Sequence, residues 1–77
     1  MPFRELMSAH ALREARREGI SLDEIEESYV YPDFVRTSHH EIAREIRSLY
    51  VGDAAIEVVV DTIDGRVVTV WRKHLDP

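Results

Sequence analysis

The feature that most constrains this chain is a pair of β-branched runs near its C-terminus. Val58–Val60 form the first run and Val67–Val70 the second. Between them lies Asp64-Gly65, a dipeptide that tolerates the positive φ angles of a type I′ turn. The pattern predicts a β-hairpin. With a two-residue loop, the register follows from the loop length and places Glu57 opposite Arg72.

This register assigns the hairpin side chains to two faces. The first face would carry Ile56, Val58, Val60, Val67, Thr69 and Trp71. The second would carry Glu57, Val59, Asp61, Val68, Val70 and Arg72. We expect the first face to receive the helices and form the core, and the second to be the place to look for a groove.

The residues before the hairpin predict two helices. Apolar residues recur at three- and four-residue spacing up to Gly19, which suits a helix C-terminus, so a helix is expected over about residues 3–18. Ser21 and Glu24 form a capping box at the start of a second, shorter helix with an acidic outer face. Pro32 closes that segment.

Two further strands are expected between the helices and the hairpin. Residues 34–37 form a short β-like run. Residues 41–51 fit either a helix or a strand by periodicity, and the turn signal Gly52-Asp53 favours a strand over about residues 43–51 that leads into the hairpin. The expected fold is therefore α+β, a single domain over residues 1–77. Two N-terminal helices would pack on one face of a three- to four-stranded, mainly antiparallel sheet ending in the β-hairpin.

Size and charge limit the classes of function. A chain of 77 residues without cysteine has a small core that a partner chain would support, which is compatible with a homodimer. No secretory signal or membrane span is apparent, and we expect a cytoplasmic protein with no membrane partner. The net charge is −5, but residues 20–33 hold five acids and no base, so a local basic surface remains open.

Short motifs along most of the chain carry a family resemblance. They are His10-Ala11-Leu12, Gly19-Ile20-Ser21, Pro32-Asp33, Val58–Asp61 and Val68–Trp71. With these motifs the chain resembles the small DUF4258-type proteins of bacteria and archaea, which are grouped with the RelE-like and barnase-like ribonuclease toxins. The resemblance implies an α+β fold, metal-independent cleavage or binding of RNA without a cofactor, and an antitoxin-like protein as partner.

The first predicted helix carries one group of candidate site residues. His10 would serve as general base or acid, and Arg13 and Arg17 would grip phosphate. In the alternative interpretation the same stripe is a solvated helix face, held together by pairs such as Glu14 with Arg17. The two arginines that the family places on this helix fall on Glu14 and Glu18 in this chain.

The sheet carries a second group. Glu57 would act as general base and Arg72 as its phosphate-binding neighbour, with His74 behind them and Arg44 reaching the groove from the next strand. The alternative for Glu57 and Arg72 is a cross-strand ion pair at the end of the sheet. Trp71 and Tyr50 are interpreted as core residues rather than base-stacking platforms.

His39, His40 and Glu41 are interpreted as a polar turn and not as a metal site, because adjacent residues of an extended chain point to opposite sides. A second interpretation of the whole chain stays open beside the toxin-type one. It is a non-catalytic module of the same fold that dimerises or binds another protein.

Overall fold

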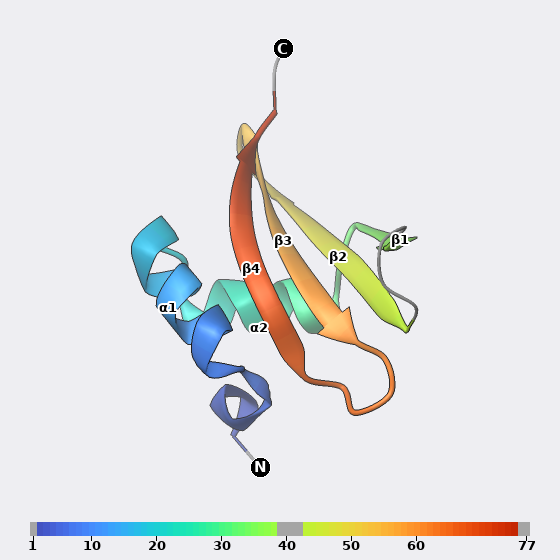
Figure 1. The fold of residues 1–77 in the computed structure, drawn as a ribbon. Coiled ribbons are helices and arrows are strands. Elements are labelled where there is room, and N and C mark those ends of the chain that lie inside the picture. Colours follow the sequence, from blue (N-terminus) through green and yellow to red (C-terminus); the bar gives the residue numbers. More distant parts are fainter. Residues whose placement is uncertain (1, 39–42, 76–77) are drawn as a thin grey trace.

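The computed structural model describes residues 2–38 and 43–75. Within these residues it contains the 3-10 turn η1 (Phe3–Leu6), the helices α1 (Ala9–Glu18) and α2 (Leu22–Val30), and the strands β1 (Phe34–Thr37), β2 (Arg44–Val51), β3 (Ala54–Asp61) and β4 (Val67–His74). The strands form one antiparallel sheet in the order β1-β2-β3-β4. The helices pack on one face of this sheet, as the sequence predicts; α2 passes behind the strands and α1 runs beside β4 (Figure 1).

The predicted first helix is interrupted near its start. Met7 forms a parallel bridge with Val67 instead of continuing the helix. Ser8 then becomes the N-cap of α1: its hydroxyl accepts a hydrogen bond from the Ala11 N–H at 3.0 Å and donates one to the Val68 carbonyl at 2.9 Å. The spacing of apolar residues does not reveal this break, because Met7 is buried in the bridge as an apolar position of a continuous helix would be.

The second helix begins as predicted. The Ser21 hydroxyl accepts from the Glu24 N–H at 3.1 Å, and the Glu24 carboxylate accepts from the Ser21 N–H at 3.1 Å, which completes the capping box. Further along α2, the hydroxyl of the buried Ser28 lies 3.0 Å from the Arg47 carbonyl and 3.1 Å from the Ile56 carbonyl. This hydroxyl attaches α2 to β2 and β3.

Strands are confirmed over both uncertain segments. The run at 34–37 is β1, and the strand predicted over about residues 43–51 is β2. Gly52, at a left-handed φ of 62°, and Asp53 form the tight turn into β3, since Val51 pairs with Ala54 across it. The predicted turn at His39, His40 and Glu41 lies outside the described residues.

The hairpin is present, but its predicted register is wrong. The two strands end at Asp61 and Val67, so the loop has five residues rather than two. A type I′ turn needs positive φ at both central residues, and in this loop only Gly65 has it, at 74°. A β-bulge at Val59/Val60 accompanies the longer loop, and Glu57 pairs with Trp71 instead of Arg72.

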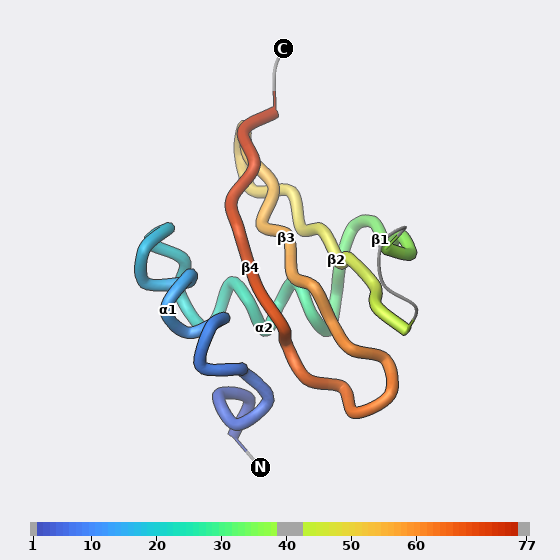
Figure 2. Tube along the Cα trace, in the orientation of Figure 1, coloured from blue at the N-terminus to red at the C-terminus, as the bar shows by residue number. Residues whose placement is uncertain are grey.

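The corrected register moves four side chains of β4 to the opposite face. Val70 joins Val67 on the helix-covered face, whereas Thr69 and Trp71 lie on the opposite face. Arg72 also points to the helix side, where its guanidinium donates a hydrogen bond to the Glu18 carbonyl at 3.0 Å. The trace in Figure 2 shows β4 between α1 and β3. The core is formed by Met7, Ala11, Ala15, Ile20, Ile25, Ile56, Val58, Val60, Val67 and Val70.

Candidate functional site

The face of the sheet that points away from α1 and α2 carries a buried carboxylate. We call it the uncovered face; by the strand register it comprises Phe34, Arg36, Arg44, Ile46, Ser48, Tyr50, Ala55, Glu57, Val59, Asp61, Thr69, Trp71 and Lys73. Glu57 lies at its centre and is only 2% exposed. A charged group so deeply buried is costly unless several donors satisfy it.

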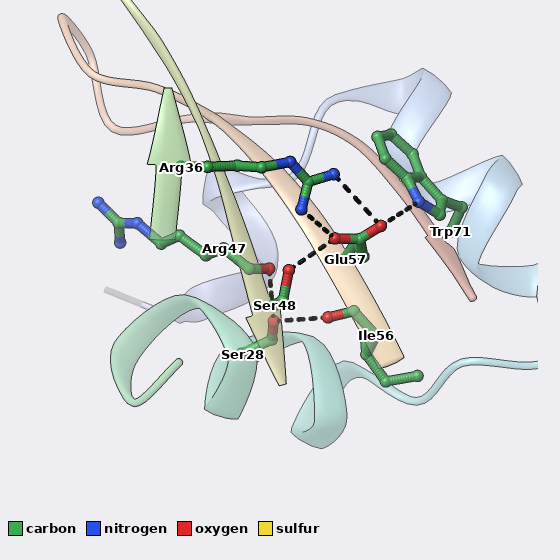
Figure 3. A network of polar contacts seen from close by, with 7 residues as sticks. All are labelled: Ser28, Arg36, Arg47, Ser48, Ile56, Glu57 and Trp71. Carbon is green, nitrogen blue, oxygen red and sulfur yellow. Dashed lines mark hydrogen bonds and ion pairs between the residues drawn. The ribbon is translucent and has the colours of Figure 1, made fainter. Parts of the chain in front are cut away.

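Three side chains from three other strands donate hydrogen bonds to Glu57 (Figure 3). Ser48 Oγ of β2 lies 2.6 Å from Oε2, and Trp71 Nε1 of β4 lies 3.0 Å from Oε1. Arg36 of β1 reaches across β2 and places Nη1 2.8 Å from Oε2. The carboxylate therefore connects all four strands on the face that lacks helices.

These donors keep the carboxylate ionised. Burial raises the pKa of Glu57, but the hydrogen bonds from Arg36, Ser48 and Trp71, together with the charge of Arg36, lower it by more. The pKa of Glu57 thus lies below its ordinary value of 4.5. At neutral pH the group is a hydrogen-bond acceptor that fixes its neighbours, and it has no proton to donate as a general acid.

The neighbours that Glu57 fixes are an aromatic ring and a guanidinium. The Trp71 indole has one N–H, and its bond to Glu57 sets the orientation of the ring. The Arg36 side chain remains 39% exposed, and its guanidinium has more N–H groups than the carboxylate accepts. A flat apolar surface and a cation are thereby held side by side.

Compared with protein-family models, curated proteins and solved structures, the chain shows no significant match. The function is therefore argued from the chemistry of the site.

Further aromatic and basic side chains surround the Glu57 cluster. Phe34 lies in the same row across the strands as Ser48, Glu57 and Trp71, and 51% of its surface is exposed. Tyr50 and Lys73 are both opposite Ala55 in the adjoining row, and Tyr50 is 52% exposed. Arg44 and Asp61 are register partners at the other end of β2 and β3.

The helix candidates lie elsewhere. His10, Arg13 and Arg17 are exposed on α1, which packs on the opposite side of the sheet from Glu57. The predicted pairing of Glu14 with Arg17 is present, with Oε2 2.9 Å from Nε. The α1 stripe and the Glu57 cluster are therefore two separate surfaces.

The sheet candidates are also divided between the two faces. Glu57 and Arg44 are on the uncovered face, but Arg72 and His74 alternate with Trp71 and Lys73 and so point to the helix side of β4. The proposed pairing of Glu57 with Arg72 is wrong, because the hairpin register differs by one residue. The interpretation of Trp71 and Tyr50 as core residues is wrong. Trp71 lies partly buried on the uncovered face, outside the core cluster, because the register of β4 differs by one residue. Tyr50 is on the same face of β2 and is half exposed.

Sequence reasoning missed Arg36 and Ser48. Alternation within β1 and β2 places both on one face of their strands, and that signal is readable from the sequence. Their contact with Glu57 depends on the order of the strands and on the long Arg36 side chain, which crosses β2.

Two further properties concern the described residues as a whole. Among residues 2–38 and 43–75, no group of three histidine, aspartate or glutamate side chains is placed to hold a metal ion. None of the described helices has the length and apolar character needed to cross a membrane.

Proposed function

We propose that the uncovered face binds single-stranded RNA by stacking bases on its aromatic side chains. The observation that carries this proposal is the buried Glu57 carboxylate, which holds the partly exposed Trp71 ring and Arg36 guanidinium in fixed positions on the face of the sheet without helices. Prepositioned rings lose less conformational entropy when a base stacks on them.

The arrangement of the aromatic residues supports the proposal. Phe34 and Trp71 are at the two ends of one row of four strands, about 14 Å apart at the usual strand spacing. Tyr50 lies one row away on β2. A short single strand crossing the sheet would meet several rings in succession, and stacking on rings tolerates any base.

The charge distribution is compatible with RNA despite the net charge of −5. The four acids of α2 are on the helix side, and that helix has no base. On the uncovered face, Arg36 compensates Glu57, and Lys73 adds a positive charge. Such a face attracts phosphate weakly, so we expect stacking to supply most of the affinity.

Cleavage, which the family resemblance implies, has weaker support than binding. His10 and His74 are on the helix side, and the Glu57 carboxylate already accepts from three residues. Binding is therefore the activity that we propose, and the integrity of the RNA is measured in the same reaction.

The test is a fluorescence anisotropy titration of a labelled RNA oligonucleotide with matched aromatic variants. Tyr50→Ala removes an exposed ring from the uncovered face, and Tyr31→Ala removes a ring that is 75% exposed beyond the end of α2. Loss of one stacked base costs about 1–3 kcal/mol, so Tyr50→Ala should weaken binding by about 5-fold to 150-fold. Tyr31→Ala should leave the affinity unchanged.

The salt dependence gives a second measurement. With Arg36 and Lys73 as the two phosphate contacts, log K should fall against log salt with a slope of about −1.4. Equal affinities for Tyr50→Ala and Tyr31→Ala would refute the proposed site. A loss of affinity seen only in the double variant Arg13→Ala with Arg17→Ala would instead place RNA binding on α1. Titration with a DNA oligonucleotide of the same sequence shows whether the site is specific for RNA or binds any single-stranded nucleic acid.

A further inference from the structure

The outward surface of α1 is a cluster of arginines. Arg13, Arg16 and Arg17 are all exposed. Arg17 pairs with Glu14 on its own helix, whereas Arg13 and Arg16 have no acidic partner within ion-pair distance among the described residues. Two guanidinium groups therefore remain for a contact outside the chain.

The outward surface of α2 has the opposite charge and is hollowed. Asp23, Glu26, Glu27, Val30 and Tyr31 line a hollow of about 510 Å³. The three carboxylates have no basic neighbour in α2, and the Tyr31 ring is three-quarters exposed beside them. Carboxylates next to an open aromatic face form a favourable environment for guanidinium groups, through paired hydrogen bonds and cation–π contact.

We propose that two copies of this chain pair through their helices, with α1 of one copy in the hollow on α2 of the other. Charge complementarity identifies the occupant: the acidic hollow is suited to bind exposed arginines, and α1 of the same chain carries them. Both helices are on the same side of the sheet, so a twofold axis between them forms the contact twice and closes the assembly at two copies. This pairing is independent of the RNA proposal and leaves both uncovered faces pointing outward.

The size of the surfaces sets the expected strength. Helices of 10 and 9 residues are each about 15 Å long, so the contact covers on the order of 300 Å² per copy. This area is below that of stable complexes and is dominated by charge. We expect a weak dimer, with a dissociation constant on the order of 100 µM, that dissociates at high salt.

Sedimentation equilibrium of the full chain between about 20 µM and about 1 mM tests the pairing. The weight-average mass should rise with concentration at about 0.05 M NaCl and return to that of the monomer at about 0.5 M NaCl. A wild-type chain that stays monomeric at about 1 mM in low salt overturns the proposal.

Charge reversal identifies the surfaces. Arg13→Glu with Arg16→Glu makes both helix surfaces acidic, and Glu26→Lys with Glu27→Lys makes both basic. Each double variant alone should be monomeric because like charges face each other, and an equimolar mixture of the two should associate at least as well as the wild type. All four positions are exposed, so circular dichroism should show an unchanged fold. Association that survives in either variant alone, or a mixture that stays monomeric, overturns the assignment.

Discussion

The replacement Glu57→Gln tests whether the buried carboxylate organises the uncovered face. Glutamine has the same shape but only one accepting oxygen. Its better orientation keeps that oxygen at the Oε2 position, where Arg36 and Ser48 donate at 2.8 and 2.6 Å. The amide N–H₂ then faces the Trp71 indole N–H, so two donors meet across about 3 Å with no acceptor between them.

The expected cost follows from these contacts. A buried donor left unsatisfied costs about 1–3 kcal/mol. Loss of the charge opposite Arg36 adds about 0.5 kcal/mol, a small value because that side chain is 39% exposed. Glu57→Gln should therefore lower the free energy of unfolding by about 1.5–3.5 kcal/mol at pH 7. At about 4–8 °C per kcal/mol for a domain of this size, Tm should fall by about 6–28 °C.

The dependence of stability on pH provides a sharper measurement. Because the folded state has the lower pKa at Glu57, the contribution of this group is fully present above its unfolded pKa and is lost as the pH falls through its folded pKa. Urea unfolding of the wild type and Glu57→Gln, from neutral to acidic pH, should show the difference between them shrinking in acid. Trp71 is the only tryptophan of the chain, so its fluorescence reports directly on the cluster.

The matched control is Glu45→Gln. Glu45 pairs with Arg47 at 3.0 Å, but both side chains are partly exposed, at 34% and 23%, so the cost should stay below about 1 kcal/mol. If Glu57→Gln has no larger effect than Glu45→Gln at pH 7, the carboxylate does not organise this face and the argument built on it fails.

Two further predictions concern the start of β4. Ser8→Ala removes both the cap of α1 and its bond to Val68, and should cost about 1–2 kcal/mol in urea unfolding; Ser8→Thr, which retains the hydroxyl, is the control and should recover most of the loss. Gly65→Ala forces a side chain onto a φ of 74° and puts a Cβ 3.2 Å from the Tyr29 hydroxyl, so Tm should fall by about 5–10 °C in a thermal melt. Gly52→Ala is the control, because it has the same backbone strain but no atom within 4 Å of the new Cβ, and its Tm should fall by less.

Local chemistry made the helices and strand positions predictable. The capping box of Ser21 and Glu24 involves neighbours in the sequence, and the turn at Gly52 connects adjacent strands, so both follow from short-range rules. The break at Met7 was not predictable in this way, because it depends on pairing with Val67, 60 residues further along the chain.

The candidate site was only half predictable. Glu57 stood out because a charged residue interrupts an apolar strand. Its partners did not, because an unseen bulge shifted β4 by one residue and replaced Arg72 with Trp71 at the opposite position. Arg36 comes from the far edge of the sheet, and no local pattern connects β1 with β3.

The bond from Ser8 to Val68 has a consequence for the order of folding. It joins residues 60 positions apart, so α1 reaches its place on the sheet only after the last strand exists. β2, β3 and β4 are connected by short turns and can pair early, whereas α1 must close a loop of nearly the whole chain. During synthesis, α1 leaves the ribosome before the strands but would therefore be among the last of these elements to dock, and Ala11 and Ala15 would remain in contact with water until β4 emerges.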